Sequence, residues 1–419
     1  MKRTFFIFFL LIVSCSDKEK ELVNYQSFIE QGEKINLLNT VNLNLKNEQK
    51  INKLINSKYH IYKGWPEEGQ NSKNLITSTR ISIADKKKKS INQNIHKSLI
   101  YKKKIVTINK NSKIKILDLD LKTILTTSIY KRSVYKNYNI DFKIIAYKDK
   151  LFIADTLGNL HCLSFKTLKV LWKKKYDVPF KSNIKVNKND LFIINSNSKI
   201  FSINIQNGNL NWSFETSSKK IKDDNSYQIA IHDEKLFFTN DSAEIYCIDL
   251  SKNNILWSLV FRNENYQNKP LVFKSSPITI DNKGNLFVSS NYGSTYMIDG
   301  QNGSVKWSKP IYFINRFAVL ENYLLNSFDD RIIVLEKSSG NIILNKKISI
   351  PKKKEKLNFK DVVIGLDNIY LFDKLGYLIS INKKNLNQFF INKVLKNYHG
   401  LSIYNQNIFI WSENKLVKF

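Results

Sequence analysis

An all-β fold, an eight-bladed β-propeller of four-stranded antiparallel blades, is predicted by three features of this 419-residue sequence. A segment that often ends in tryptophan repeats along the chain, each repeat carries strand patterns joined by tight turns, and the last repeat stops before its final strand. Repeats of about 40–45 residues that contain several short strands are typical of propellers, in which each repeat forms one blade.

Four tryptophans mark the repeat: Trp172, Trp212, Trp257 and Trp307. The same register continues through three copies in which Thr126, Leu344 and Phe390 take the tryptophan position. Nine residues earlier, all seven copies have an aliphatic residue, namely Leu117, Leu163, Ile203, Ile248, Ile298, Leu335 and Ile381. Thr126 and Phe390 are 264 residues apart over six steps, so the mean period is 44 residues.

Turn-forming residues lie at two other positions of each copy. Directly after the aliphatic residue comes a polar or acidic one, and glycine often stands four residues before the tryptophan position, as at Gly208, Gly303 and Gly340. A short polar side chain accepts backbone N–H bonds and glycine supplies a positive φ, so a hairpin is predicted here. A second turn is predicted fourteen residues before the tryptophan position, at Ser112, Gly158, Ser198, Ala243, Gly293, Asp330 and Gly376.

The end of the chain predicts how the ring closes. Residues 416–419 repeat the strand that precedes each tryptophan strand, but the chain ends before the tryptophan strand itself. We expect a strand from residues 76–95 to take its place, which leaves only short, protected sheet edges. The propeller is therefore predicted for residues 76–419. Each tryptophan is predicted to lie on an outer strand and to fill the wedge between neighbouring blades.

The amino terminus has the pattern of an export signal. Lys2 and Arg3 precede an apolar run, Phe5 to Val13, that is too short to span a membrane. The sequence Ile12-Val13-Ser14-Cys15 resembles a bacterial lipobox. That resemblance implies a signal peptide at residues 1–14 and acylation of Cys15 by fatty acids such as palmitate. Ser16 favours sorting to the outer membrane. A plain secretory signal is the alternative.

Residues 15–75 are polar and rich in lysine and asparagine, so we predict a lipidated tether. A partner-binding peptide within it is the alternative. The whole chain has 67 Lys and Arg against 36 Asp and Glu, a net charge of +31. Either an anionic partner or a general lysine bias accounts for this excess. The lysine runs are scattered, without the interleaved aromatics that stack on bases, so no nucleic-acid partner is expected.

No catalytic residues, metal ligands or cofactor are predicted. Cys162 and Cys247 occupy the same repeat position in two copies, which indicates core packing, and one intervening blade makes a disulfide between them unfavourable. The five histidines show no ligand spacing. Asp118, Asp249 and Asp299 recur at a turn position, so they are interpreted as turn residues rather than as a carboxylate pair.

The segment from Met297 to Trp307, MIDGQNGSVKW, resembles the tryptophan-docking repeat of pyrroloquinoline-quinone (PQQ)-type propellers. Quinoprotein dehydrogenases share that repeat with the BamB lipoproteins of the outer-membrane β-barrel assembly (BAM) machinery. The lipobox and the stretch Gly64-Trp65-Pro66-Glu67-Glu68-Gly69, similar to the W-P-x-x-G sequence that precedes alphaproteobacterial BamB propellers, favour the BamB family.

The resemblance implies a non-enzymatic scaffold on the periplasmic face of the outer membrane, with a BamA-type protein and unfolded outer-membrane proteins as partners. In the family, BamA contacts the loops after the third and fourth blades, here residues 217–227 and 262–274. The candidate contact residues are Lys222, Asp223, Asp224, Arg262, Asn265, Tyr266 and Lys274. The family's acidic motif falls on Val272 and Lys274, so it is not matched. The alternatives are a quinoprotein-like enzyme and a propeller that binds an envelope polymer.

Overall fold

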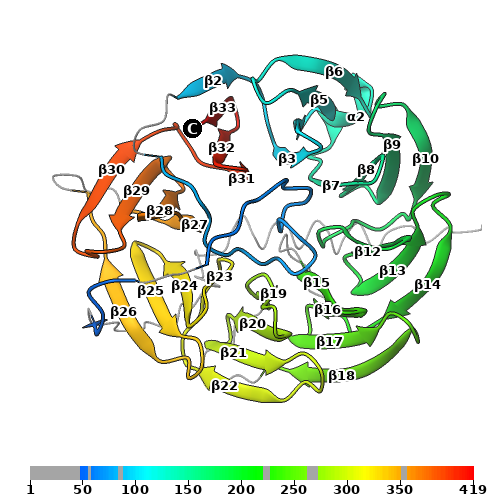
Figure 1. Ribbon diagram of the computed structural model, residues 1–419. Helices are drawn as coiled ribbons and strands as arrows, with labels where there is room; N and C mark the ends of the chain where they lie inside the picture. The colour runs from blue at the N-terminus through cyan, green and yellow to red at the C-terminus, as the bar shows by residue number, and fades with distance from the viewer. Residues whose placement is uncertain (1–47, 55–57, 84–87, 220–226, 262–271, 351–355) are drawn as a thin grey trace, which may run out of the picture. The chain divides into compact units, whose positions relative to one another are not determined.

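Eight sheets are arranged in a ring in the computed structural model, which describes residues 48–54, 58–83, 88–219, 227–261, 272–350 and 356–419 (Figure 1). Within these residues seven sheets have four strands and one has five, and every pairing between neighbouring strands is antiparallel. The predicted eight-bladed all-β propeller is confirmed. One short helix, α2 (Arg132–Asn137), lies between the first two blades in the described part of the chain.

Each blade is formed by consecutive strands, numbered here from the inner to the outer strand. Blade 1 contains β3 (Lys97–Tyr101), β4 (Lys104–Ile108), β5 (Lys113–Leu117) and β6 (Thr123–Ser128), and blade 2 contains β7 (Phe142–Tyr147), β8 (Lys150–Asp155), β9 (Asn159–Ser164) and β10 (Val170–Lys175). Blade 3 contains β11 (Lys185–Asn187), β12 (Asp190–Ile194), β13 (Lys199–Asn204) and β14 (Leu210–Glu215). Blade 4 contains β15 (Ile229–His232), β16 (Lys235–Thr239), β17 (Glu244–Asp249) and β18 (Asn254–Val260).

The remaining four blades follow the same plan. Blades 5 to 7 are β19 (Thr279–Ile280), β20 (Asn285–Ser290), β21 (Ser294–Asp299), β22 (Val305–Lys309); β23 (Ala318–Val319), β24 (Tyr323–Phe328), β25 (Arg331–Glu336), β26 (Ile342–Lys347); and β27 (Phe359–Ile364), β28 (Asn368–Asp373), β29 (Tyr377–Asn382), β30 (Phe389–Lys393). Blade 8 contains β31 (Gly400–Tyr404), β32 (Asn407–Ser412) and β33 (Lys415–Lys418), with β2 (Lys89–Asn92) as its outer strand.

The ring closes as predicted. β2 comes from within residues 76–95 and pairs antiparallel with β33, so the last blade is completed by the chain's own early segment. Blade 8 therefore contains both the first and the last strand of the propeller, β2 and β33, and this pairing closes the ring. This closure covers the edge that β33 would otherwise leave open, while within the described residues each blade other than blade 6 keeps the free edge of its outer strand.

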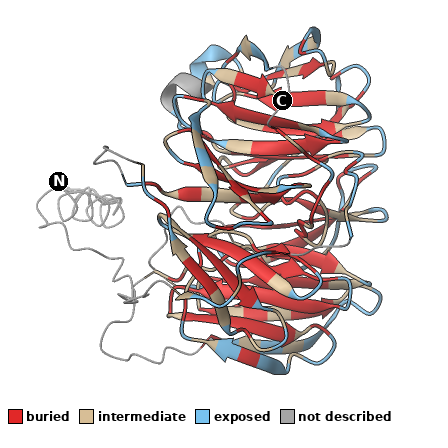
Figure 2. Ribbon diagram, turned by 60° about the vertical axis from the view of Figure 1, so that its left-hand side comes forward, coloured by how far each residue is buried: buried red, intermediate tan, exposed pale blue. Residues whose placement is uncertain are grey.

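The repeated positions have the roles that their residue types predict. All seven aliphatic positions are 2% exposed or less, and the buried strands fill the body of each blade (Figure 2). The Asp249 carboxylate accepts the N–H groups of Ser251 (2.8 Å) and Lys252 (3.1 Å), as expected for a turn residue. Six of the seven residues at the other turn have a positive φ; in blade 6 it is Asp329 rather than Asp330, since the turn is shorter there.

The tryptophans of blades 2, 4 and 5 contact the hairpin of the next blade. Their indole N–H groups donate to carbonyl oxygens there: Trp172 to Ile205 (3.3 Å), Trp257 to Gly300 (3.3 Å) and Trp307 to Lys337 (3.0 Å). The indole faces lie where a Cβ would be at Gly208, Gly303 and Gly340, which have φ values of 73°, 76° and 69°. Glycine is required at these turns both for the backbone conformation and for the approach of the ring.

The described part of the predicted tether differs from that expectation. β1 (Glu48–Gln49) pairs with the outer strand β26, and Leu54 packs into a core cluster of blades 6 and 7. Residues 58–75 lie inside the ring, where Tyr62 and Trp65 are each 1% exposed. Burial of these apolar side chains stabilises the fold, and an extended linker in solvent would not bury them. Residues 15–47 lie outside the described residues.

The two ends of the ring differ in their connections. Because each blade runs from inner to outer strand, the hairpins between strands one and two and between strands three and four lie at one end, named here the turn face. The middle hairpin and the connection to the next blade lie at the other end, named the loop face. The axial segment, the cavity and the loops described below are placed by these two faces.

Candidate functional site: the axial segment and the cavity above it

The chain from residue 58 to residue 83, named here the axial segment, runs once around the inside of the ring (Figure 1). It makes backbone hydrogen bonds with seven blades in succession. These bonds join Tyr62 O to Asn405 N (blade 8, 2.6 Å), Trp65 N to Ile100 O (blade 1, 2.7 Å), Pro66 O to Ala146 N (blade 2, 2.9 Å), Ser72 O to Ile231 N (blade 4, 2.8 Å), Lys73 O to Ile280 N (blade 5, 3.0 Å), Ile76 O to Val319 N (blade 6, 2.8 Å) and Thr79 N to Ile364 O (blade 7, 2.8 Å).

These bonds satisfy backbone groups at the inner edge of each blade. An inner strand has a partner on one side only, and a buried N–H or C=O without a partner costs free energy. Because each blade is rotated relative to the last, an extended segment cannot pair with all of them as a regular strand. It contacts each in turn through one or two bonds. All the contacts lie near the carboxyl ends of the inner strands, so the axial segment closes the channel at the turn face.

The Trp-Pro-Glu-Glu-Gly sequence lies at the start of this circuit. Trp65 exchanges both backbone hydrogen bonds with Ile100, and its ring meets the edge of Tyr62. The guanidinium of Arg316 lies over the indole, 5.8 Å from the ring centroid. The sequence resemblance that pointed to a motif before the propeller therefore corresponds to a buried anchor inside it.

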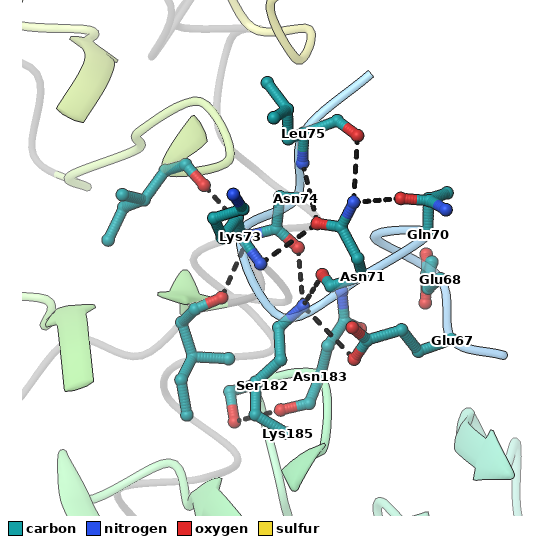
Figure 3. A network of polar contacts seen from close by, with 12 residues as sticks. Glu67, Glu68, Gln70, Asn71, Lys73, Asn74, Leu75, Ser182, Asn183 and Lys185 are labelled. Carbon is teal, nitrogen blue, oxygen red and sulfur yellow. Dashed lines mark hydrogen bonds and ion pairs between the residues drawn. The ribbon is translucent and has the colours of Figure 1, made fainter. Parts of the chain in front are cut away.

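Blade 3 contributes a side chain rather than a backbone group. Lys185, the first residue of β11, is fully buried, and its ammonium contacts the Glu67 carboxylate (3.2 Å), Asn71 O (2.9 Å) and Asn74 Oδ1 (2.6 Å) (Figure 3). Burial lowers the pKa of Lys185 and raises the pKa of Glu67, while each partner favours the charged form of the other. A buried pair of this kind holds its charges only while all its contacts are made.

Asn74 links this ion pair to the next two blades. Its side-chain amide donates to Ile229 O (3.0 Å) and Ile278 O (2.9 Å), which belong to blades 4 and 5. A Cβ at Gly69 would lie 1.8 Å from Asn74 Oδ1 and 2.9 Å from the Lys185 ammonium. Since both groups are buried and fixed by hydrogen bonds, only glycine fits at the end of the W-P-x-x-G sequence.

A cavity of about 220 Å³ lies between the axial segment and the loop face. Trp65, Glu68 and Gly69 form its floor, and its wall comes from residues at or just before the starts of the inner strands. Glu68 points into it with 44% of its side chain exposed and pairs with Lys97 (3.0 Å). Although burial opposes the charge, Lys97 and Lys143 hold the pKa of Glu68 below its usual value.

A second ion pair lies in the wall formed by blades 6 and 7. Arg316 contacts the Asp361 carboxylate at 3.6 Å, and the Tyr398 hydroxyl donates to the same carboxylate at 2.7 Å. Burial raises the pKa of Asp361, and Arg316 opposes that shift. Beside this pair is Lys360, whose pKa burial lowers and for which the described residues provide no hydrogen bond or ion pair.

The predicted partner-binding residues lie on the loop face or outside the described residues. Lys274 lines a groove of about 190 Å³ between blades 4 and 5, with Tyr227, Gln228 and Phe273. The backbone N–H of Lys274 donates to the Asn291 side chain (2.8 Å). Lys222, Asp223, Asp224, Arg262, Asn265 and Tyr266 lie outside the described residues, as does Cys15. The described ends of both loops thus border one groove.

The docking tryptophans are far less uniform than their spacing predicts. Trp172, Trp257 and Trp307 each hydrogen-bond to the following blade. For Trp212 the described residues provide no such acceptor, although its ring packs against Phe192. Asn253 stands in the turn of the next blade where the other three have glycine, and its φ is 54°.

Other chemistry-bearing residues are dispersed. Cys162 and Cys247 are buried, unpaired and two blades apart, and burial raises the pKa of each thiol to about 12. Across the described ranges no group of three His, Cys, Asp or Glu side chains is placed to hold a metal ion. No helix among the described residues is long and apolar enough to cross a membrane.

Residues 58–75 of the axial segment were predicted as a tether, so their place inside the ring was missed, whereas residues 76–83 belong to the range predicted as propeller. Two signals within it were available. A tryptophan is costly to leave in a solvated linker, and the apolar residues Leu75, Ile76, Ile81 and Ile83 approach the frequency of a core segment. No pattern in the repeats indicates which residue each inner strand presents to the axis, because those positions differ from blade to blade.

The repeat, its docking tryptophans and the ring of eight sheets define a propeller of PQQ-type repeats. The family profile described as outer membrane protein assembly factor BamB matches residues 144–346, which span blades 2 to 6. Over these blades the sequence is therefore similar to the BamB family, and the PQQ-repeat propeller fold agrees with that similarity.

Solved structures of several kinds share this fold. BamB from Moraxella catarrhalis superposes with a TM-score of 0.64 at 12% identity, over 79% of this chain and 98% of that one. A europium-containing methanol dehydrogenase gives 0.64 at 10% identity, over 83% and 89%. The quinohemoprotein alcohol dehydrogenase from Comamonas testosteroni gives 0.61 at 10% identity, over 85% and 80%. Identities this low show the fold alone. No curated protein sequence matches the chain.

Proposed function

We propose that this protein is a non-enzymatic scaffold lipoprotein of the outer-membrane β-barrel assembly complex, which assists folding and insertion of β-barrel proteins. The observation that carries the proposal is the match of residues 144–346 to the BamB profile. That range contains both loops that contact BamA in the family. It also contains the groove between blades 4 and 5 that the described ends of those loops border.

The loop face is the proposed site for a BamA-type partner. Residues 217–227 and 262–274 connect outer strands to the next inner strands, so their described ends lie at the loop face. Their described ends are held in place: Lys219 donates to the Tyr292 hydroxyl (3.3 Å), and the Ser275 and Thr239 hydroxyls lie 3.2 Å apart. We assign partner contact to Lys222, Asp223, Asp224, Arg262, Asn265, Tyr266 and Lys274.

The outer strand edges are the proposed site for unfolded clients. An outer strand presents unpaired N–H and C=O groups to which an extended chain can add. In blade 6 this addition is seen within the molecule, because β1 pairs with the outer strand β26. β18 is the longest outer strand, with seven residues and no charge, and Val260 at its end is 58% exposed. Lysines, which discourage such pairing, are present in β10 and β22.

Attachment to the outer membrane, facing the periplasm, is proposed through acylated Cys15 after removal of residues 1–14. The described chain begins at Glu48 on the rim of blade 6, so 32 residues separate the proposed anchor from it. At about 3.3 Å per extended residue, this segment is long enough for the propeller to reach a partner well away from the bilayer surface.

A pull-down from detergent-solubilised envelopes tests the scaffold proposal. We expect tagged protein to recover a BamA-type protein, and Lys274→Glu combined with Arg262→Glu to reduce recovery. Lys393→Glu with Lys396→Glu, which changes the same charge at blade 7, is the matched control. Absence of the BamA-type protein, together with normal porin levels in a deletion strain, would overturn the proposal.

A quinoprotein-like enzyme is the second candidate, favoured by the structural match to two dehydrogenases. In this chain the axial segment occupies the turn-face end of the channel, and the sequence has no adjacent cysteine pair. Bound quinone or calcium in protein purified from its native envelope would support the enzyme and overturn the scaffold. The third candidate, binding of an anionic envelope polymer, predicts retention on that polymer that disappears with salt.

A further inference from the structure

The lining of the cavity above the axial segment has more cationic than anionic side chains, and it contains buried donors that have no partner. Both carboxylates in its lining already have cationic partners: Glu68 pairs with Lys97, and Asp361 pairs with Arg316. Lys360 is a third cation in the lining; the described residues give its ammonium no hydrogen bond or close ion pair, although Asp329, Asp361 and Asp373 lie near enough to attract it. The five charged side chains in the lining therefore sum to a single positive charge.

Buried donors without a partner add to this excess. Three buried donors in the same lining have no hydrogen-bond partner: Ser98 Oγ, Trp411 Nε1 and Arg316 Nε. Ser98 and Trp411 are each 6% exposed and come from blades 1 and 8, whereas Arg316 lies just before the inner strand of blade 6. Buried polar groups in folded proteins almost always have a partner, and leaving one without costs about 1–3 kcal/mol. A wall with several such donors is suited to a group that only accepts.

The remaining lining is apolar. The rings of Trp65 and Trp411 and the side chains of Ile144, Ile229 and Leu401 contribute to it. A ligand with an apolar body therefore gains by burial, while one negative charge is balanced by the surplus cation. A second negative charge would face Glu68 and Asp361 in the same wall, which disfavours phosphate and other dianions.

We infer that the axial cavity binds a carboxylate carried on an apolar body, with Lys360 as its counter-charge. Two sources have this chemistry: a free organic acid, and an acidic side chain next to an apolar residue in a peptide that enters from the loop face. The inference does not depend on the proposed assembly role, because it rests on the lining residues alone.

Two probes distinguish these sources. 3-Phenylpropionate represents the free acid, and a capped peptide with the sequence Ala-Leu-Glu-Phe-Ala represents the peptide. Each has an uncharged counterpart, 3-phenylpropanamide and the same peptide with Gln in place of Glu. Binding to the full-length protein is followed by calorimetry and by tryptophan fluorescence, since Trp65 and Trp411 line the cavity.

We expect at least one acid to bind at millimolar concentration or tighter, and its uncharged counterpart to bind about tenfold more weakly or not at all. Lys360→Gln should weaken the binding of the acid about tenfold. Lys384→Gln, which changes an exposed lysine on the same blade and outside the lining, should leave the binding of the acid unchanged. Should Lys360→Gln fail to fold, Ser98→Ala provides a smaller change in the part of the lining that blade 1 contributes.

Binding of 3-phenylpropionate identifies a free acid as the source, and binding of the peptide alone identifies a partner's side chain. Failure of both acids to bind would overturn the inference, as would equal binding of acid and amide or an equal loss of binding with Lys384→Gln. Pull-down of a BamA-type protein is measured separately, so failure of one experiment leaves the other interpretable.

Discussion

Trp65 and Trp257 show how differently the axis and the rim of this propeller are held together. Trp257 is one of several tryptophans that contact the next hairpin in the same way, and it is half-buried on an outer strand. Trp65 has no counterpart elsewhere in the ring. It is 1% exposed, pairs with β3 through its backbone and carries Arg316 over its face. The rim repeats one contact, whereas the axis uses a different contact at every blade.

That difference has an energetic consequence. A rim contact can be weakened in one blade while its equivalents in other blades remain. The axial segment is continuous, so a change at one residue affects contacts with several blades in succession. We therefore expect axial substitutions to lower stability more than rim substitutions of the same chemical size.

Trp65→Ala gives the largest expected effect. Removing a fully buried indole should lower the free energy of unfolding by about 4–5 kcal/mol, since the cavity below Arg316 cannot collapse around a fixed backbone. Trp257→Ala is the control of equal chemistry, with an expected loss of about 2 kcal/mol because the ring is only partly buried. Denaturant unfolding of both variants measures the two losses. Equal losses would contradict the distinction between axis and rim.

Lys185→Met is expected to lower the free energy of unfolding by about 3–4 kcal/mol, because it leaves the Glu67 carboxylate buried without its cation. The double variant Lys185→Met, Glu67→Leu removes both charges and should recover most of that loss. A double-mutant cycle with Glu67→Leu alone gives the coupling between the two groups. If the double variant is as unstable as Lys185→Met, the bonds to Asn71 and Asn74 matter more than the ion pair.

The same contrast decides what the sequence predicts. Rim residues such as Gly303 and Trp307 recur at fixed spacing, so their turn and packing roles follow from the repeat alone. β2 was predictable because a ring with an incomplete last blade needs a strand from elsewhere in the chain. Glu67 and Lys185 are 118 residues apart and follow no period, so nothing local indicates that they meet. Their pairing depends on the path of residues 58–83, which only the closed ring determines.

His161 is a titratable group buried within the body of blade 2. It adds a pH-dependent effect to the comparison of the axis and the rim. Burial lowers its pKa to about 4, with Lys173 acting in the same direction, and its Nδ1 atom has no partner. The unfolded chain binds a proton near pH 6.5 and the folded chain only near pH 4. The contribution of His161 to the free energy of unfolding is therefore fully present above pH 6.5. It is lost as the pH falls toward 4, by an amount on the order of 3 kcal/mol.

The measurement compares the unfolding free energy of the parent protein and His161→Gln at several values between pH 7 and pH 4, about the range set by the two pKa values. The difference between them should change steadily over that interval and level off on both sides. A difference that stays constant with pH would mean that His161 titrates alike in both states. Lys and carboxylate groups that both proteins share cancel in this comparison.

The smallest predicted effect concerns Trp212, the docking tryptophan whose contact is incomplete. In the next blade Asn253 holds a positive φ of 54° at the position where Gly208, Gly303 and Gly340 admit an indole against the backbone. Asn253→Gly removes the Cβ that stands in the way, so the Trp212 ring should move toward the turn and its N–H should reach the Leu250 carbonyl. The new hydrogen bond contributes about 1 kcal/mol, partly offset by the extra freedom of glycine in the unfolded chain. A downfield shift of the Trp212 indole N–H resonance, with slower exchange and a slightly higher unfolding midpoint, is the expected result. An unchanged resonance would show that the neighbouring hairpin, rather than the side chain at residue 253, sets the position of the ring.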